Sequence, residues 1–213
     1  MATVITNYFE LGESTIIWKD DVLPDFLHET LVQSFQEAQW HGGDYEGRKV
    51  SRKQRWYHTN GSYFCDKWPN FERWRSHSYT DSMLEAQSYI QSYVKKEFNI
   101  DIDINSVLVN YYENGKIIIP KHRDNEEIFG DNPNVIVISL GSTRTLRFSR
   151  VEPHVSSLRT TGQIIDIDLK PKSLLIMQGT TQKYFCHELL ASESQEPRYS
   201  MTFRNHVFQS IQP

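Results

Sequence analysis

The residues whose types and spacing could do chemistry lie in one short segment, residues 110–126. It contains His122 and Asp124, two residues apart, shortly after the β-branched run at 117–119. Successive side chains of an extended chain point to opposite faces, so this imidazole and this carboxylate would lie side by side. Two histidines and one carboxylate that leave open positions are typical of non-haem iron(II) sites. A third ligand is therefore expected from elsewhere in the chain. By itself, the pair also fits a histidine hydrogen-bonded to an acid at a strand end.

Two downstream histidines are candidates for the third ligand. His187 lies in a strand-like stretch, residues 184–188, that precedes the basic C-terminal strand. His206 is the alternative, because it continues the polar face of that strand. A single strand histidine is more often a core residue with satisfied hydrogen bonds than a metal ligand. We expect His187 to be the ligand if the site exists.

The last predicted strand, residues 198–204, alternates completely between polar and apolar side chains. One face carries Arg198, Ser200, Thr202 and Arg204, and the other carries Tyr199, Met201 and Phe203. Two arginines are costly to bury unless an anion lies between them. Guanidinium groups bind carboxylates through paired hydrogen bonds, so this face suits a dicarboxylate. Their spacing spans about 20 Å of extended chain, so the two side chains would have to converge. The alternative is an amphipathic edge strand with its polar face in solvent.

A basic and aromatic segment occupies residues 48–64. Five of the eight residues from 48 to 55 are basic, and Trp56, Tyr57, Tyr63 and Phe64 follow. The Asn60-Gly61 pair predicts a hairpin turn between two strands. Basic groups for phosphates beside aromatic faces for bases are typical of surfaces that bind single-stranded nucleic acid. The alternative is a solvated charged edge above a small aromatic core.

The remaining pattern predicts helices first and strands afterwards. A strand is expected at 15–18, a helix that opens at Pro24 and ends at Gly42-Gly43, and a second helix from Thr80 or Asp81 to about Phe98. From residue 106 onward we expect at least seven short strands among eight ranges, which are 106–112, 117–122, 135–140, 145–149, 163–168, 173–177, 184–188 and 198–207.

This order of elements predicts an α+β fold. Its core would be a double-stranded β-helix, a jelly roll of the cupin type, with the N-terminal helices and a β-hairpin lid packed outside. We expect one domain over 1–213, with an N-terminal helical extension at 1–104, a lid at about 45–65 and a jelly-roll catalytic core at 105–207.

Composition indicates a globular chain. The 213 residues are 38% hydrophobic and 13% aromatic, with a net charge of −4 and two cysteines. The chain has no apolar run long enough for a bilayer, no signal-peptide pattern and too few cysteines for a disulfide framework. We expect a soluble intracellular monomer of the cytoplasm or nucleus that does not bind membranes. The net charge argues against a surface coated in basic groups, although local patches can bind phosphates.

The candidate residues form an ordered set along the chain: Asn110 with Tyr112, His122 with Asp124, His187, and Arg198 through Arg204. This set resembles the AlkB-like family of iron(II)- and 2-oxoglutarate-dependent dioxygenases, which oxidatively remove alkyl groups from nucleic-acid bases. The resemblance covers about residues 105–207. It continues more weakly through residues 51–54, which are similar to the nucleotide-recognition lid of the DNA-repair members.

The resemblance implies cofactors and a role for each candidate residue. The cofactors would be Fe(II), 2-oxoglutarate and O₂, and the partner would be alkylated DNA or RNA. The implied metal ligands are His122, Asp124 and His187, which with Arg204 would be the catalytic residues. The implied 2-oxoglutarate contacts are Arg198 and Arg204, one at each end, with Asn110, Tyr112 and Thr202. The implied substrate contacts are Arg52, Lys53, Gln54, Trp56, Tyr57, Asn125 and Glu126.

The chain departs from the family pattern at two positions. Ser200 stands where the family commonly has asparagine, which removes an amide donor near the co-substrate. Asn125 stands where repair members often have an acid that contacts the base, so the identity of the substrate stays open. The alternatives are an Fe(II)/2-oxoglutarate hydroxylase of a protein or small molecule, and a non-catalytic jelly-roll binding module.

Overall fold

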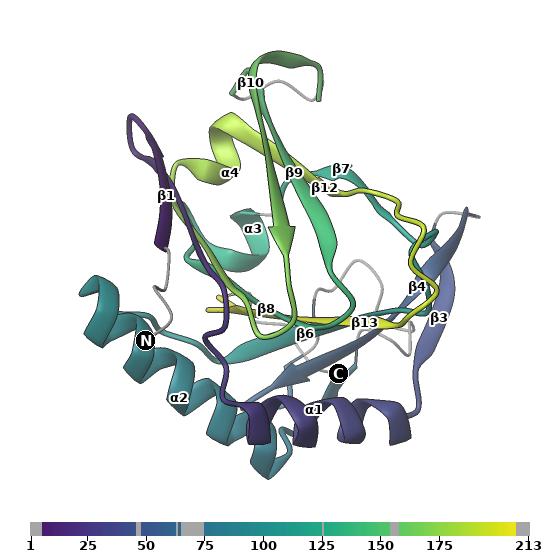
Figure 1. The fold of residues 1–213 in the computed structure, drawn as a ribbon. Helices are drawn as coiled ribbons and strands as arrows, with labels where there is room; N and C mark the ends of the chain where they lie inside the picture. Colours follow the sequence, from purple (N-terminus) through teal and green to yellow (C-terminus); the bar gives the residue numbers. More distant parts are fainter. Residues whose placement is uncertain are drawn as a thin grey trace.

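Two facing β-sheets and two long helices make up the fold (Figure 1). The structure, a computed structural model, describes residues 6–45, 48–62, 64, 75–124, 126–153 and 158–207. Within these residues the major sheet has the order β1 (Thr6–Leu11), β2 (Ser14–Lys19), β11 (Leu174–Gly179), β8 (Val135–Gly141), β13 (Arg198–Arg204), β6 (Ser106–Tyr112), β4 (Arg48–His58) and β3 (His41–Tyr45), with β5 (Ser76–His77) beside β4. The minor sheet has the order β10 (Thr160–Leu169), β9 (Arg144–Val151), β12 (Phe185–Leu189) and β7 (Ile119–His122).

Helices α1 (Asp25–Glu37) and α2 (Asp81–Phe98) lie along the outer face of the major sheet (Figure 1). Their buried residues recur every three or four positions, as in Leu27, Leu31 and Phe35 of α1. The Thr80 hydroxyl caps α2 by accepting a hydrogen bond from the Met83 amide at 3.3 Å. Two short helices, α3 (Glu126–Phe129) and α4 (Thr181–Tyr184), follow β7 and β11. No helix in the described parts of the chain is long and apolar enough to cross a membrane.

Alternation along β13 separates two interiors. Tyr199, Met201 and Phe203 belong to the core that the major sheet forms with α1 and α2. A second core, which includes Phe148, lies between the two sheets. The polar residues of β13 face this inter-sheet space and are buried as well. The polar face of this strand is therefore not an edge in solvent.

Strands β6–β13 occupy all eight ranges expected from the sequence, and the facing sheets confirm the predicted jelly-roll core. Two details of the N-terminal half are wrong. The first helix ends at Glu37, and Gly42 and Gly43 lie in β3 instead of terminating the helix. The segment at about 45–65, expected to pack outside the core as a lid, contains β4, which is a strand of the major sheet.

The joining of β4 to the sheet follows from its pairing. Residues 53–58 pair antiparallel with residues 106–111 of β6, and β3 pairs along the other edge. Asn60-Gly61 forms a turn after β4, but no described strand returns from it as an antiparallel arm. Tyr63, which was expected on that arm, lies outside the described residues. Both faces of β4 carry buried rings, so the strand packs into the interior.

His58, the last residue of β4, should make the stability of the fold depend on pH. His58 is buried, its ring lies 5.1 Å from that of His206, and its Nδ1 accepts a hydrogen bond from the Asn60 amide at 3.1 Å. Burial, together with the nearby His206, lowers the pKa of His58 to about 4. An unfolded histidine titrates near its ordinary value of 6.5, so below that pH the unfolded state binds the proton more readily.

We expect the stability that neutral His58 provides to be complete above pH 6.5 and lost as the pH falls toward 4. His58→Asn keeps an acceptor for the Asn60 amide but does not titrate. Urea unfolding at pH 7 and pH 5 should show about 1–2 kcal/mol less acid destabilisation in this variant than in the wild type. An equal drop in both proteins would contradict the assignment.

Candidate metal centre and active site

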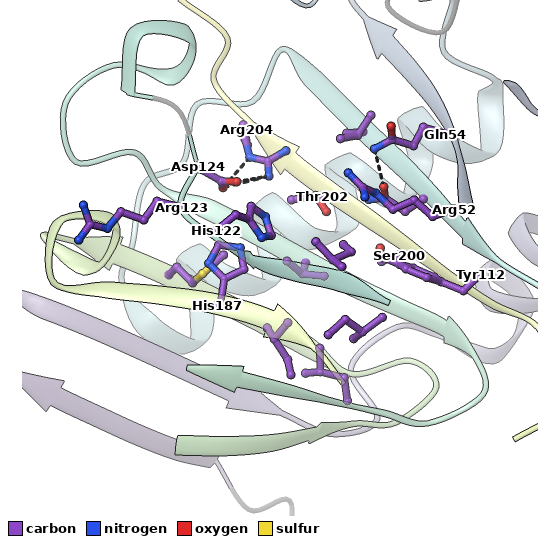
Figure 2. A pocket seen from close by; sticks show the side chains of 18 of the residues that line it. Arg52, Gln54, Tyr112, His122, Arg123, Asp124, His187, Ser200, Thr202 and Arg204 are labelled. Atoms are coloured by element: carbon purple, nitrogen blue, oxygen red, sulfur yellow. Dashed lines mark hydrogen bonds and ion pairs between the residues drawn. The ribbon is translucent and has the colours of Figure 1, made fainter. Parts of the chain in front are cut away.

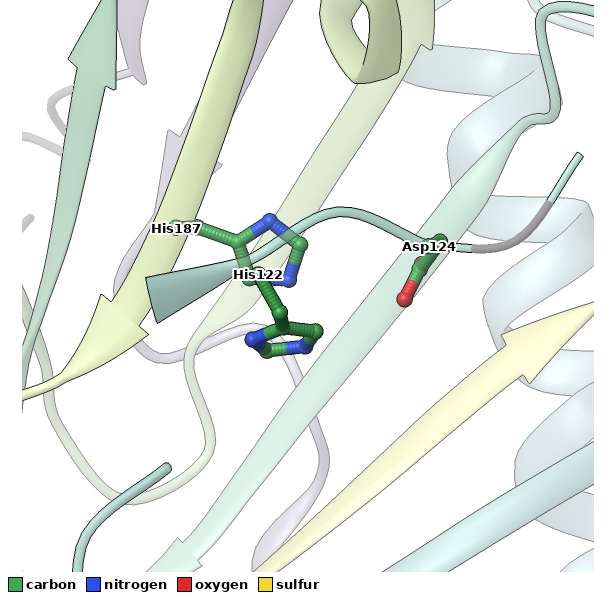
Figure 3. Close-up of side chains that lie close together, drawn as sticks. All are labelled: His122, Asp124 and His187. Carbon is green, nitrogen blue, oxygen red and sulfur yellow. The ribbon is translucent and has the colours of Figure 1, made fainter. Parts of the chain in front are cut away.

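The register between β12 and β7 brings the two candidate histidines together. His187 lies directly opposite His122 in the antiparallel pair, and the centroids of their rings are 4.3 Å apart. Asp124 follows two residues after the end of β7 and turns its carboxylate toward both rings (Figure 3). One ligand atom from each residue lies within 4.8 Å of the others. The fold therefore brings His187 together with the His122–Asp124 pair, and the role of the three as metal ligands stays a prediction.

His206 occupies a different place. Its ring packs against Trp56, His58 and Phe129, and its Nε2 lies 2.9 Å from the Phe64 carbonyl oxygen. It does not line the cavity and is not part of the described three-residue cluster. The alternative third ligand is therefore not supported by its position.

Burial prepares the two histidines for metal binding. It lowers the pKa of His187 to about 3, and His122 adds to the effect. Burial also lowers the pKa of His122, against the opposing influence of Asp124. Both rings are thus neutral at pH 7, which is the form that coordinates a metal ion. No proton has to leave either ring when a cation enters.

Arg204 holds the carboxylate of Asp124. Its Nε donates to Oδ2 at 3.0 Å, and its Nη2 donates to Oδ1 and Oδ2 at 2.9 Å each (Figure 2). Burial alone would raise the pKa of Asp124, but the charge of Arg204, with His187 and His122, lowers it below the ordinary value. The carboxylate is therefore ionised and oriented in a site that is almost closed to solvent.

A cavity of about 220 Å³ surrounds this group and extends between the two sheets. Its apolar walls are built from both sheets by Leu108, Val137, Leu146, Leu169, Met177 and Leu189. Its polar lining is Arg52, Gln54, Asn110, Tyr112, His122, Arg123, Asp124, His187, Arg198, Ser200, Thr202 and Arg204, many of which appear in Figure 2. The cavity thus collects every predicted metal and co-substrate residue.

Arg198 is an almost fully buried cation on the cavity wall. Its Nη2 donates to the Ser139 hydroxyl at 2.9 Å, and its guanidinium lies 5.2 Å from the centre of the Tyr112 ring. Burial lowers its pKa to about 10, so it stays charged at pH 7. Among the described residues, no carboxylate pairs with it, and its Nε lacks a hydrogen-bond partner. Nη1 of Arg204 is likewise a buried donor without a partner.

The part of β4 that faces the cavity adds a further arginine. Arg52 lines the cavity, and burial lowers its pKa. Its Nε has no hydrogen-bond partner within the described residues. Beside it, Gln54 donates from Nε2 to Oδ1 of Asn110 at 2.8 Å. This bond connects β4 with β6 inside the cavity.

Other predicted substrate contacts lie elsewhere. Lys53 points to the opposite face of the sheet, where its Nζ lies 5.5 Å from the centre of the Tyr111 ring. Trp56 and Tyr57 are buried in separate apolar clusters and do not line the cavity. Among the described side chains of the basic run, Arg52 and Lys53 therefore lie on opposite faces of the sheet. Asn125 and the side chain of Glu126 lie outside the described residues.

Several residues of the site were not expected from the sequence. Arg123, between two expected ligands, lines the cavity, and its Nη2 donates to the Glu152 carbonyl at 2.7 Å. The buried Arg144 donates to the Ile117 carbonyl at 2.8 Å and lies 5.9 Å from the Tyr112 ring. Gln182 contacts the main chain of Asp124. Of these residues, only Arg123 could have been found from the sequence, because it lies between His122 and Asp124.

The geometry predicts one divalent ion per chain. His187→Ala should abolish binding because it removes a ligand, whereas His206→Ala should leave it within a few-fold of wild type. Because burial lowers the pKa of both imidazoles, protons should compete with the metal, and weaken its binding, only well below the ordinary histidine value of 6.5. Calorimetric titration of the wild type and each variant with Mn²⁺, at neutral and at acidic pH, measures these affinities. Loss of binding in His206→Ala with retention in His187→Ala would contradict the assignment.

About half of the chain is similar in sequence to known oxygenases. Human "Alpha-ketoglutarate-dependent dioxygenase alkB homolog 3" is 34% identical over 110 residues, which cover 51% of this chain and 38% of that protein. Mouse "DNA oxidative demethylase ALKBH2" is 31% identical over 101 residues, which cover 47% of this chain and 42% of that protein. The matching region therefore spans less than half the length of these relatives.

Similarity of fold extends further along the chain. A solved structure titled "The structure of OsALKBH1" superposes with a TM-score of 0.62 at 15% identity, covering 93% of this chain and all of that one. The sequence profile of the 2OG-Fe(II) oxygenase superfamily matches residues 17–204. The chain therefore belongs to the 2OG-Fe(II) oxygenase superfamily, and over about half of its length it is similar to AlkB homologues.

Proposed function

We propose that the protein removes N-alkyl groups from nucleic-acid bases by oxidation. It would use Fe(II), 2-oxoglutarate and O₂, and release an aldehyde, succinate and CO₂. The observation that carries the proposal is one cavity that holds a three-ligand metal group and four arginines, of which only Arg204 has a carboxylate partner among the described residues. The relatives named above as a DNA oxidative demethylase and alkB homologues support the choice of substrate.

The donor set fits the metal. Two neutral imidazoles and one ionised carboxylate, His122, His187 and Asp124, are the ligands expected of a non-haem iron(II) site with open positions. Iron, when bound, supplies the oxidising chemistry together with O₂ and 2-oxoglutarate. The ligands are held before any metal enters, because the β7–β12 pairing sets the histidines and Arg204 sets the carboxylate.

The buried arginines fit the co-substrate. A 2-oxoglutarate dianion would neutralise the charge of Arg198 at one end and satisfy its unpartnered Nε. Arg204 keeps Nη1 available for a second carboxylate while it pairs with Asp124. Asn110, Tyr112, Ser200 and Thr202 line the space between them. We assign the two ends of the diacid to these two arginines.

The substrate side of the cavity is formed by β4. Arg52 and Gln54 present donors to the cavity, and no described carboxylate pairs with Arg52. A base of DNA or RNA would have to leave its stack to reach this space. The surrounding apolar side chains exclude water from the reacting groups. The buried positions of Trp56 and Tyr57 leave no role for them in stacking on that base.

Arg198→Ala should raise the 2-oxoglutarate requirement steeply, since it leaves one buried carboxylate unpaired at a cost of about 2–5 kcal/mol. Arg198→Lys should restore only part of the affinity because an ammonium cannot form the paired hydrogen bonds. Titration of 2-oxoglutarate into Mn²⁺-loaded protein measures the effect. The surface variant Arg147→Ala, which loses an ion pair with Asp166, serves as the control. Identical titration curves for Arg198→Ala and the control would refute the assignment.

Arg52→Ala and Lys53→Ala form a matched pair, because neighbouring residues of β4 point to opposite faces. Arg52→Ala should raise KM for a methylated oligonucleotide at least about tenfold, since an ion-paired hydrogen bond contributes about 1.5–3 kcal/mol. Lys53→Ala should change KM little. Both should retain 2-oxoglutarate turnover in the absence of oligonucleotide. A larger effect at Lys53 would place the nucleic acid on the other face, and no effect at either would favour a protein or small-molecule substrate.

A further inference from the structure

Gln182 makes a contact with the metal group that neither the sequence pattern nor the family match identifies. Its side chain is buried, and its Oε1 accepts a hydrogen bond from the backbone N–H of Asp124 at 3.0 Å. Its Nε2 points to Sδ of Met177, which lines the cavity, at 3.7 Å. The amide therefore joins the floor of the cavity to the segment that carries the carboxylate ligand.

The segment around Asp124 needs such a contact. Asp124 lies beyond the end of β7 and before α3, so no strand ladder holds its main chain. Arg204 binds only the carboxylate, from the opposite sheet. Among the described residues, Gln182 is the partner that fixes the backbone of Asp124.

The element that carries Gln182 is firmly anchored. The Thr180 amide donates to the Glu13 carbonyl at 3.1 Å, and the Thr180 and Ser14 hydroxyls lie 2.9 Å apart. The Thr181 hydroxyl donates to the Thr15 carbonyl at 3.2 Å. Helix α4 continues directly into β12, which carries His187. Gln182 is therefore held close in the chain to His187, and through its hydrogen bond it fixes Asp124 relative to His187.

We propose that Gln182 is a positioning residue for the metal centre, which sets the place of Asp124 relative to His187. The inference rests on the proposed function only as far as the metal site. Hydrogen bonds that orient ligands commonly change metal affinity by about 10–100-fold. Gln182 acts on the main chain of its ligand, so its effect should appear in metal binding itself and not only in turnover.

Three variants test the proposal. Gln182→Met keeps the length of the side chain but removes the acceptor. Gln182→Glu keeps an acceptor oxygen for the Asp124 amide. Gln178→Met is the matched control, because Gln178 is also a glutamine next to α4, and its amide donates to Asn134 at 3.0 Å, away from the cavity. Kd for Mn²⁺ alone is measured by calorimetry, and Tm is measured on metal-free protein.

Gln182→Met should raise Kd for Mn²⁺ by about 10–100-fold, while its Tm falls no more than that of Gln178→Met. Gln182→Glu should bind Mn²⁺ with a Kd within a few-fold of that of the wild type. Unchanged Kd in Gln182→Met, or equal weakening in Gln178→Met, would overturn the role of Gln182 and leave the metal site standing. Failure of wild-type protein to bind Mn²⁺ would overturn the metal site and this inference together.

Discussion

Burial of the polar face of β13 is the constraint on which the rest of the structure depends. Arg198 and Arg204 are both almost fully buried, which is costly unless anions accompany them. Asp124 supplies one anion, and it pairs with Arg204. The described residues offer Arg198 hydrogen bonding and a Tyr112 ring but no carboxylate. The unpaired charge of Arg198 thus suits this strand to a site for an anionic ligand.

The surrounding fold serves to keep this site closed and ordered. The central position of β13, between β6 and β8, gives it two rigid neighbours, and α1 and α2 cover the apolar face. The minor sheet closes the polar face and supplies His122 and His187 from paired strands. Because the two histidine ligands come from the minor sheet and Arg198 and Arg204 from the major sheet, the cavity requires both sheets to be in place.

Local periodicity predicted much of this arrangement. The alternation in residues 198–204 indicated a polar face, because successive side chains of a strand point to opposite faces, and the two-residue spacing of His122 and Asp124 indicated a metal pair. Contacts across long separations could not be predicted in this way. Asp124 and Arg204 are 80 residues apart, and Asp124 and Gln182 are 58 apart. The lid expected at about 45–65 was placed outside the core because the charge of this segment gave no sign that β4 pairs with β6 and buries Trp56 and Tyr57.

The most direct test is a balance of products. Iron-loaded protein is incubated with 2-oxoglutarate, O₂ and N-methylated single- or double-stranded DNA or RNA oligonucleotides, and mass spectrometry follows the oligonucleotide while succinate is quantified. We expect loss of the methyl group, with about one succinate formed for each methyl removed from a preferred oligonucleotide. Succinate production with every oligonucleotide unchanged would contradict the dealkylase assignment.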